Sequence, residues 1–144
     1  MQYNKDVPKL VSLIELETHL DNRGQITVAD LPFQPKRMYT LSGMSKETIR
    51  CLHAHKSLVQ LMFCLSGSFK LTITSPLEEE SFLLNSQSSV AVLIPAGLWR
   101  RCSEFSEDCL VMVLASEKYE KSDYIYDFEE YVLWYSSRST EISS

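Results

Sequence analysis

The sequence lacks several features that would define a class of protein at once. Its four cysteines, at positions 51, 64, 102 and 109, form no CxxC spacing, which argues against a zinc ribbon or a redox pair. The longest apolar stretch, VAVLIPAGLW, is too short to span a bilayer and contains Pro95 and Gly97. The first twenty residues lack the apolar core and cleavage site of a signal peptide. We therefore expect a cytoplasmic protein with free thiols and no membrane contact.

A dominant basic charge is also absent. The formal net charge is −5, so we expect no nucleic-acid partner, although local basic clusters remain compatible with this total. Apolar residues make up 44% of the 144 residues, which suits one globular domain with a sizeable core. The segment 136–144 contains almost no apolar residues. We expect a single domain over residues 1–135 and a disordered tail over 136–144.

Short strand-like runs dominate the chain. Residues 68–75, SFKLTITS, alternate apolar and polar side chains, and Ser66-Gly67-Ser68 predicts a hairpin turn before them. The sequence near 122–134 instead places aromatic residues at near-helical spacing. This pattern predicts an all-β jelly-roll sandwich or barrel with a short C-terminal helix. The strands are expected in the ranges 25–31, 37–43, 59–67, 68–75, 80–85, 89–95 and 109–116.

Two of the three histidines stand close together in RCLHAHK, residues 50–56. On a strand, His53 and His55 share one face and Ala54 points to the other. Taken alone, the pair is compatible with a metal clamp, an acid/base pair or two histidines without a role. The spacing resembles the first motif of the cupin superfamily, in which HxH precedes an acidic residue and then a glycine.

Two ligand positions of that cupin pattern differ in this chain. Gln60 stands where the pattern has a carboxylate, and Arg100 stands where the second motif, PxG, is followed by a histidine. Arginine cannot coordinate a cation because it is always protonated. Arg100, with Arg50, Arg101 and Lys56, instead favours an anion such as a phosphate. We therefore expect no metal at this site.

Beyond the cupin motifs, about 80% of the chain resembles one subfamily, the WxcM-like dTDP-sugar 3,4-ketoisomerases. Four features depart from the usual pattern. Cys51 stands where a glycine usually follows the arginine, Tyr126 stands where an arginine usually follows DYI, and the segments SPLEEE and SQSSVAVLIPA replace the usual ones. The matching stretches are Arg23-Gly24, LPFQPKRMY, RCLHAHK, Gln60, LSGS, IPAGLWR and FSEDCLVMVLASEKYEKSDYIYDFEEY.

The resemblance implies an enzyme that isomerises dTDP-4-keto-6-deoxy-D-glucose to a 3-keto sugar. It implies a place on the route to 3-amino sugars of surface glycans, such as a lipopolysaccharide O-antigen. It also implies that the reaction needs no metal or other cofactor. Members of the subfamily form homodimers that exchange N-terminal strands, so the same assembly is expected here.

The reaction needs a base near neutral pKa, a second proton carrier and a group that holds an oxyanion. From the match to HAHK, we assign His53 as the base that acts on the sugar ring. His55 would carry the second proton or polarise the oxygen, and Tyr39 would donate a proton through its phenol. Arg50 and Gln60 would orient or stabilise the enediolate.

The remaining basic residues of the motifs are expected to bind the substrate. Arg37, Lys56 and Arg100 would contact the diphosphate or nearby sugar oxygens. Arg23 and Trp99 complete the predicted substrate-binding set, although core packing is an equal alternative for Trp99. Tyr39 has an ordinary strand aromatic as its alternative. His19 is expected on the surface, the C-terminal aromatics in helix packing or a dimer contact, and Cys51 on the cavity wall by strand alternation.

Two other functions stay open at this point. A dTDP-sugar 3,5-epimerase shares the fold and substrate but usually relies on a histidine with an aspartate partner, and no such aspartate follows HAHK. A non-enzymatic sugar-sensing cupin would normally be joined to a DNA-binding domain, for which 144 residues leave no room.

Overall fold

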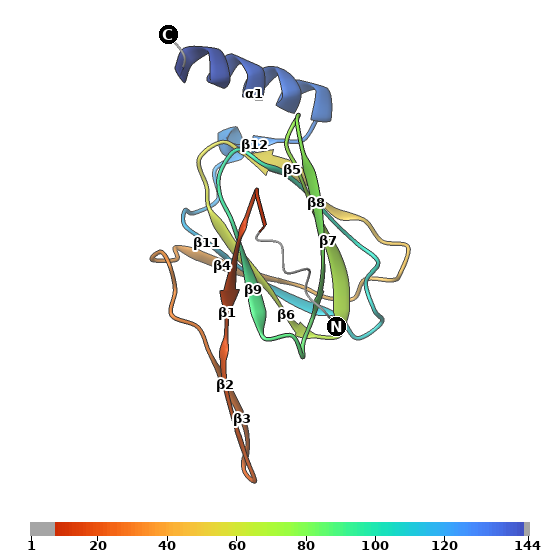
Figure 1. Ribbon diagram of the computed structural model, residues 1–144. Helices are drawn as coiled ribbons and strands as arrows, with labels where there is room; N and C mark the ends of the chain where they lie inside the picture. The colour runs from red at the N-terminus through yellow and green to blue at the C-terminus, as the bar shows by residue number, and fades with distance from the viewer. Residues whose placement is uncertain (1–7, 143–144) are drawn as a thin grey trace.

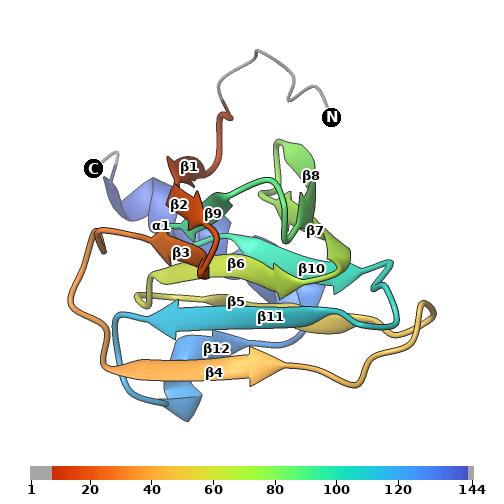
Figure 2. The same ribbon diagram turned by 90° about the horizontal axis from the view of Figure 1, so that it is seen from below.

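The computed structural model describes residues 8–142, which form two five-stranded antiparallel sheets facing each other (Figure 1, Figure 2). A separate two-stranded hairpin extends from one end of the body, and a helix lies at the other end (Figure 1). The elements are β1 (Ser12–Glu15), β2 (Glu17–Asp21), β3 (Gly24–Val28), β4 (Arg37–Leu41), β5 (Arg50–His55), β6 (Gln60–Ser66), β7 (Ser68–Thr74), β8 (Glu79–Asn85), β9 (Val90–Ile94), β10 (Trp99–Ser103), β11 (Leu110–Ala115), η1 (Lys121–Asp123), β12 (Tyr124–Ile125) and α1 (Phe128–Ile142).

The strand order places sequence-distant segments side by side. One sheet has the order β1-β9-β6-β11-β4, and the other has the order β12-β5-β10-β7-β8. His53 and His55 lie at the end of β5, and the neighbouring strand β10 begins at the end of the second motif and carries Arg100. Strands β4 and β6 belong to the facing sheet. This architecture confirms the predicted all-β sandwich, and it brings the two motifs together.

The main core fills the space between the two sheets. On β7, Phe69, Leu71 and Ile73 are fully buried in this core, as their alternation predicts. Burial of a large apolar side chain of this kind contributes about 1.5–3 kcal/mol to folding. Gly67, with φ 71°, forms the turn between β6 and β7. The hairpin predicted there is wrong, because β6 belongs to one sheet and β7 to the other, and β7 pairs with β8 instead.

The helix α1 covers a second, smaller core on the outer face of β5 and β10. Tyr131 is fully buried there against Ala54, Trp99 and Ile125, and its hydroxyl donates to the carbonyl of Gly97 at 2.8 Å. The helix begins at residue 128 because residues 124–125 pair with β5 as a strand, and it continues past residue 135, where we expected the folded domain to end. Within residues 8–142, no helix is long and apolar enough to cross a bilayer.

The hairpin of β2 and β3 has no sheet partner among the described residues of its own chain. Every residue of both strands is exposed, including Leu20 at 76% and Ile26 at 63%. An isolated two-stranded hairpin is only marginally stable in water. Its apolar side chains therefore form a surface that is suited to association with another chain.

Candidate active site

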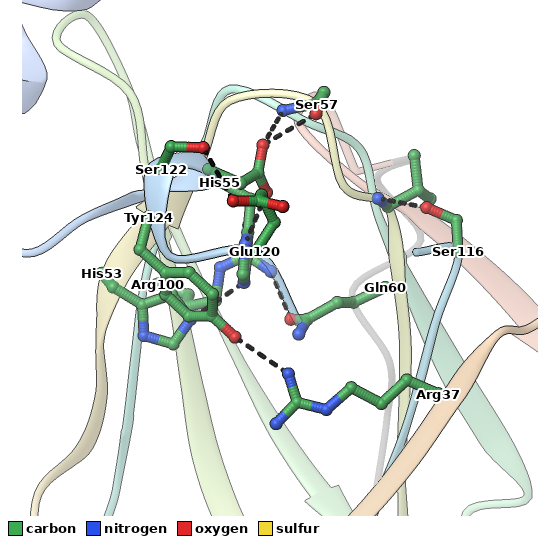
Figure 3. A network of polar contacts seen from close by, with 12 residues as sticks. Arg37, His53, His55, Ser57, Gln60, Arg100, Ser116, Glu120, Ser122 and Tyr124 are labelled. Carbon is green, nitrogen blue, oxygen red and sulfur yellow. Dashed lines mark hydrogen bonds and ion pairs between the residues drawn. The ribbon is translucent and has the colours of Figure 1, made fainter. Parts of the chain in front are cut away.

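The histidine pair lies between the sheets. Strand alternation directs His53 and His55 inward and Ala54 outward beneath α1. The Nε2 atoms of the two imidazoles are 3.1 Å apart, and the rings are nearly perpendicular. His55 is fully buried and His53 is 9% exposed. Because one Nε2 must donate and the other accept, the rings form a hydrogen-bonded pair suited to passing a proton (Figure 3).

A second polar chain runs through Arg100, Gln60 and Tyr39. Arg100 is fully buried, and it donates to Gln60 Oε1 and to the carbonyl of Leu98. Since guanidinium can only donate, the amide oxygen of Gln60 faces Arg100 and its Nε2 donates to the Tyr39 hydroxyl at 3.0 Å. The Tyr39 hydroxyl accepts that bond, so its own proton remains free for another acceptor. Burial raises the pKa of Tyr39 to about 12, which keeps the phenol protonated.

The Arg100 guanidinium lies in the sandwich without a carboxylate. No acidic side chain pairs with Arg100 among the ion pairs of residues 8–142, and its Nε atom is buried without a hydrogen-bond acceptor. In the sheet, Arg100 lies opposite His53. A buried, uncompensated cation next to two imidazoles favours an anion that forms during a reaction.

An aspartate that the sequence analysis missed lies behind His55. Asp123 Oδ2 is 3.0 Å from His55 Nδ1, and Asp123 Oδ1 accepts from the amide and hydroxyl of Ser57 at 2.8 and 2.7 Å. The histidine therefore has an aspartate partner, contrary to the expectation drawn from the residues after HAHK. Asp123 is 68 positions from His55 in the sequence and belongs to the DYI stretch. The match of that stretch to the subfamily was the signal that could have identified Asp123.

Both imidazoles are held in the neutral form. Burial, then Arg100, then the neighbouring imidazole lower the pKa of His53 from 6.5 to about 3. Burial and Arg100 also lower the pKa of His55 to about 4, although Asp123 opposes this shift. At neutral pH each ring therefore has one unprotonated nitrogen. The pKa of His53 nevertheless lies well below the near-neutral value that we expected of the base.

We expect the free energy of unfolding to decrease as the pH falls below about 6.5. In the unfolded chain both histidines take up protons near pH 6.5. In the folded chain His55 does so only at about pH 4 and His53 only at about pH 3. The unfolded state therefore binds more protons in this window, which costs roughly 1.4 kcal/mol per histidine per pH unit. Urea denaturation at a series of pH values tests this, and His53→Asn should lose about half of the slope. A flat profile would contradict the buried neutral pair.

Three tyrosines form an aromatic wall beside the histidines. The Tyr124 ring lies 4.3 Å from the ring of His55 and 5.1 Å from that of His53, and it contacts Tyr119 and Tyr126. We expected Tyr119 and Tyr124 to pack with the C-terminal helix or at a dimer contact. They lie at the site instead, because residues 124–125 form a strand next to β5.

Arg37 joins this wall from β4. Its guanidinium lies over the rings of Tyr39 and Tyr119 at 5.2 and 5.3 Å. It also donates to the Tyr124 hydroxyl at 3.3 Å (Figure 3). Lys56 lies in an adjoining cleft of about 760 Å³ that Ser57 and Asp123 also line. The structure therefore brings Lys56 close to the site, on the side of Asp123.

The other predicted site residues lie elsewhere in this chain. Arg50 is exposed at the start of β5. Trp99 packs against Phe128 and Tyr131 beneath α1, because it neighbours Arg100 on β10 and so faces the opposite way. Arg23 is exposed at the hairpin turn and pairs with Asp21. As predicted, His19 is exposed on the same hairpin.

The donor set at the histidines does not suit a cation. No group of three or more His, Cys, Asp or Glu side chains among the described residues converges to hold a metal ion. Arg100 and Gln60 occupy the two positions at which the cupin pattern has its other metal ligands. That the reaction needs no metal stays a prediction.

Comparison with known proteins now identifies the family. Residues 9–136 match the family described as FdtA: WxcM-like, C-terminal. The chain belongs to this family. A curated member, TDP-4-oxo-6-deoxy-alpha-D-glucose-3,4-oxoisomerase of Aneurinibacillus thermoaerophilus, is 31% identical over 123 residues, which cover 83% of this chain and 88% of that one.

Solved structures agree with this membership. The 3,4-ketoisomerase QdtA of Thermoanaerobacterium thermosaccharolyticum, solved with TDP, is 35% identical and superposes with a TM-score of 0.84 over 90% of this chain and 96% of that chain. ChmJ, a 3'-monoepimerase of Streptomyces bikiniensis, is 17% identical, with a TM-score of 0.72 over 81% of this chain and 68% of that chain, so it shares the fold alone. Within the FdtA family, this chain is an isomerase of the sugar 3,4-ketoisomerase class.

Proposed function

We propose that the protein converts dTDP-4-keto-6-deoxy-D-glucose to the 3-keto isomer by histidine acid/base transfer. The observation that carries this proposal is the hydrogen-bonded pair of neutral imidazoles beside a buried guanidinium that lacks a carboxylate. The curated relative carries this substrate in its name, and a histidine-to-asparagine variant of QdtA was solved with TDP-4-keto-6-deoxyglucose.

The isomerisation passes through an enediol. One carbon-bound proton leaves C3 and one reaches C4, while the C4 oxygen gains a proton and the C3 oxygen loses one. His53 removes the proton from C3, and the C4 carbonyl oxygen becomes an oxyanion. Arg100 stabilises this charge, and Tyr39 supplies a proton because its phenol is protonated and its hydrogen is free. The Tyr39 phenolate then takes the proton of the C3 hydroxyl and becomes a phenol again, and the imidazole pair returns to C4 the proton that left C3. The keto group ends at C3, with no net gain or loss of protons.

The same proposal assigns the diphosphate to the basic residues near the site. Arg37 lies on the aromatic wall beside the pair, and Lys56 lines the adjoining cleft with Asp123, so they are the proposed contacts for the phosphates and nearby sugar oxygens. Trp99 and Arg23 remain predicted substrate contacts, and Arg50 a predicted stabiliser of the enediolate, by resemblance only. For Arg23, a role requires the exposed hairpin to meet a second chain.

Incubation with dTDP-4-keto-6-deoxyglucose in deuterated water tests the reaction. We expect NMR to show a 3-keto sugar with solvent deuterium at the new C4 position, and we expect chelators to leave the rate unchanged. Deuterium at C5 would identify an epimerase instead. Binding without any label would identify the sugar-sensing alternative, and activity that a chelator removes and a metal restores would contradict the proposed chemistry.

We expect a homodimer in which the β2–β3 hairpins exchange, because their apolar side chains are exposed in the single chain. The double variant Leu20→Asp with Ile26→Asp should shift the protein from dimer to monomer in light scattering after size exclusion. Leu77→Asp, at a residue that is 86% exposed on the β7–β8 turn, is the matched control and should remain dimeric. A monomeric wild type would contradict the exchange.

The proposed setting is the cytoplasm, on a route to 3-amino sugars of surface glycans. The four free thiols support a reducing compartment. The 3-keto product is the form that an aminotransferase acting at C3 requires. An enzyme of that class would therefore consume the product.

A further inference from the structure

Asp123 is held more firmly than a surface carboxylate. The peptide carbonyl of Asp123 accepts from the amide of Lys56 at 2.9 Å, and residues 124–125 pair with β5. Ser57 supplies two hydrogen bonds to Oδ1, and His55 contacts Oδ2. Burial raises the pKa of Asp123, but the hydrogen bonds from Ser57 and His55 outweigh it and leave the pKa lowered. The side chain is therefore a carboxylate that can only accept.

This carboxylate determines where the protons of the two imidazoles lie. Because Asp123 only accepts, His55 carries its proton on Nδ1 and leaves Nε2 bare. The bare Nε2 then accepts from Nε2 of His53, so the free lone pair of His53 is on Nδ1. A proton taken up by His53 can thus pass to His55, whose imidazolium Asp123 stabilises.

We propose that Asp123 is a positioning residue that sets the tautomers of His55 and His53 and so gives the proton relay its direction. This inference rests on the proposed function, because the relay matters only if the imidazoles transfer protons. Asp123 does not touch the substrate in this scheme. It acts through His55.

Asp123→Asn tests the role. The fixed N–H of Ser57 needs an acceptor, so the amide oxygen of the variant faces Ser57 and its NH₂ faces His55. His55 must then accept at Nδ1 and carry its proton on Nε2, which breaks the relay. We expect kcat to fall roughly 10²- to 10⁴-fold, with KM nearly unchanged, and Asp123→Glu to restore part of the rate.

Two further measurements separate positioning from stability. Nitrogen-15 NMR of the histidines should show protonated Nδ1 on His55 in the wild type and protonated Nε2 in Asp123→Asn, whatever the catalytic rate. Asp127→Ala is the matched control, since Asp127 accepts from the amide of Glu130 and caps α1; loss of the cap should lower the melting temperature but leave kcat unchanged. The same tautomer in both proteins, or an unchanged kcat, would overturn the proposal. A wild type that does not act on the ketosugar would refute the proposed function, while the tautomer measurement would still decide the role of Asp123.

An independent observation concerns Cys51 and Cys102 on neighbouring strands. Their sulfur atoms are 2.9 Å apart, and the pairing of β5 with β10 is irregular between Arg100 and Cys102. Cys51 has φ 67°, a left-handed conformation that is unfavourable for any residue other than glycine. A hydrogen bond from Cys102 lowers the pKa of Cys51, with Arg100 and Arg50 adding to it against the effect of burial.

We further infer that Cys51 and Cys102 are a site of reversible disulfide formation with a peroxide as oxidant. The Cys51 thiolate attacks the peroxide oxygen and gives a sulfenic acid, and hydroxide from the peroxide takes up a proton as water. The Cys102 thiol then attacks the sulfenic sulfur, the S–S bond forms, and a second water leaves. Two thiols are oxidised and one peroxide is reduced. The bond would join the strands that carry His53 and Arg100.

The second cysteine pair of the chain is an internal control. Burial raises the pKa of Cys64 to about 12 and also raises that of Cys109, so neither supplies much thiolate. We expect hydrogen peroxide to remove about 2 Da per chain, peptide mapping to find the 51–102 link, and dithiothreitol to reverse it. Cys51→Gly should stay folded and form no link. A 64–109 link instead, or no intramolecular link before overoxidation, would overturn the inference.

Discussion

His53→Asn should reduce turnover of the ketosugar by roughly 10²- to 10⁴-fold and leave dTDP binding nearly intact. Asparagine is neutral and polar like the imidazole, so it can occupy the 9% exposed position without adding a charge. It cannot accept a proton from C3. The burial of His53 against Arg100 keeps the wild-type ring neutral and available as a base at neutral pH.

Steady-state kinetics and calorimetric titration with dTDP would test this result. Leu52→Asn is the matched control, because Leu52 is the preceding residue of β5 and is 45% exposed on the opposite face. It should retain activity. If His53→Asn turns over at the wild-type rate, another group removes the C3 proton and the assignment of the base is wrong.

Arg100→Met should lower kcat/KM by about 10²- to 10³-fold without destabilising the fold. The guanidinium is fully buried, has no carboxylate partner and has an unpaired Nε atom. Taking a charge out of water costs several kcal/mol, which outweighs the roughly 1–3 kcal/mol that an unpaired Gln60 oxygen would cost. The free energy of unfolding should therefore stay level or rise, while the oxyanion loses its counter-charge.

The variant makes a second measurement possible. Arg100 contributes to the lowered pKa values of His53 and His55, so both should rise in Arg100→Met, as an NMR titration would show. Arg101→Met, at the exposed neighbour on β10, should change neither activity nor the imidazole pKa values. A clearly unstable Arg100→Met with unshifted histidines would mean that Arg100 serves packing rather than electrostatics.

Local patterns were sufficient for the features that depend on neighbours in sequence. The period-2 alternation of residues 68–75 correctly predicted the buried face of β7, and the two-residue spacing of HAHK placed both imidazoles on one face. The helix boundary was wrong, because aromatic spacing near 122–127 resembles a helix while the segment pairs with β5. The strands β1 and β2 were not predicted, and β2 has no buried face that alternation could show.

The sequence by itself determined that two imidazoles share a face and that a guanidinium and an amide replace two ligands of the cupin pattern. These facts follow from residue identity and strand periodicity, which are local. Only the tertiary structure decided that Asp123 orients His55, that Trp99 faces α1 rather than the imidazoles, and that Cys51 meets Cys102. Those contacts join residues on different elements, and strand order and register, which no single segment encodes, bring them within bonding distance.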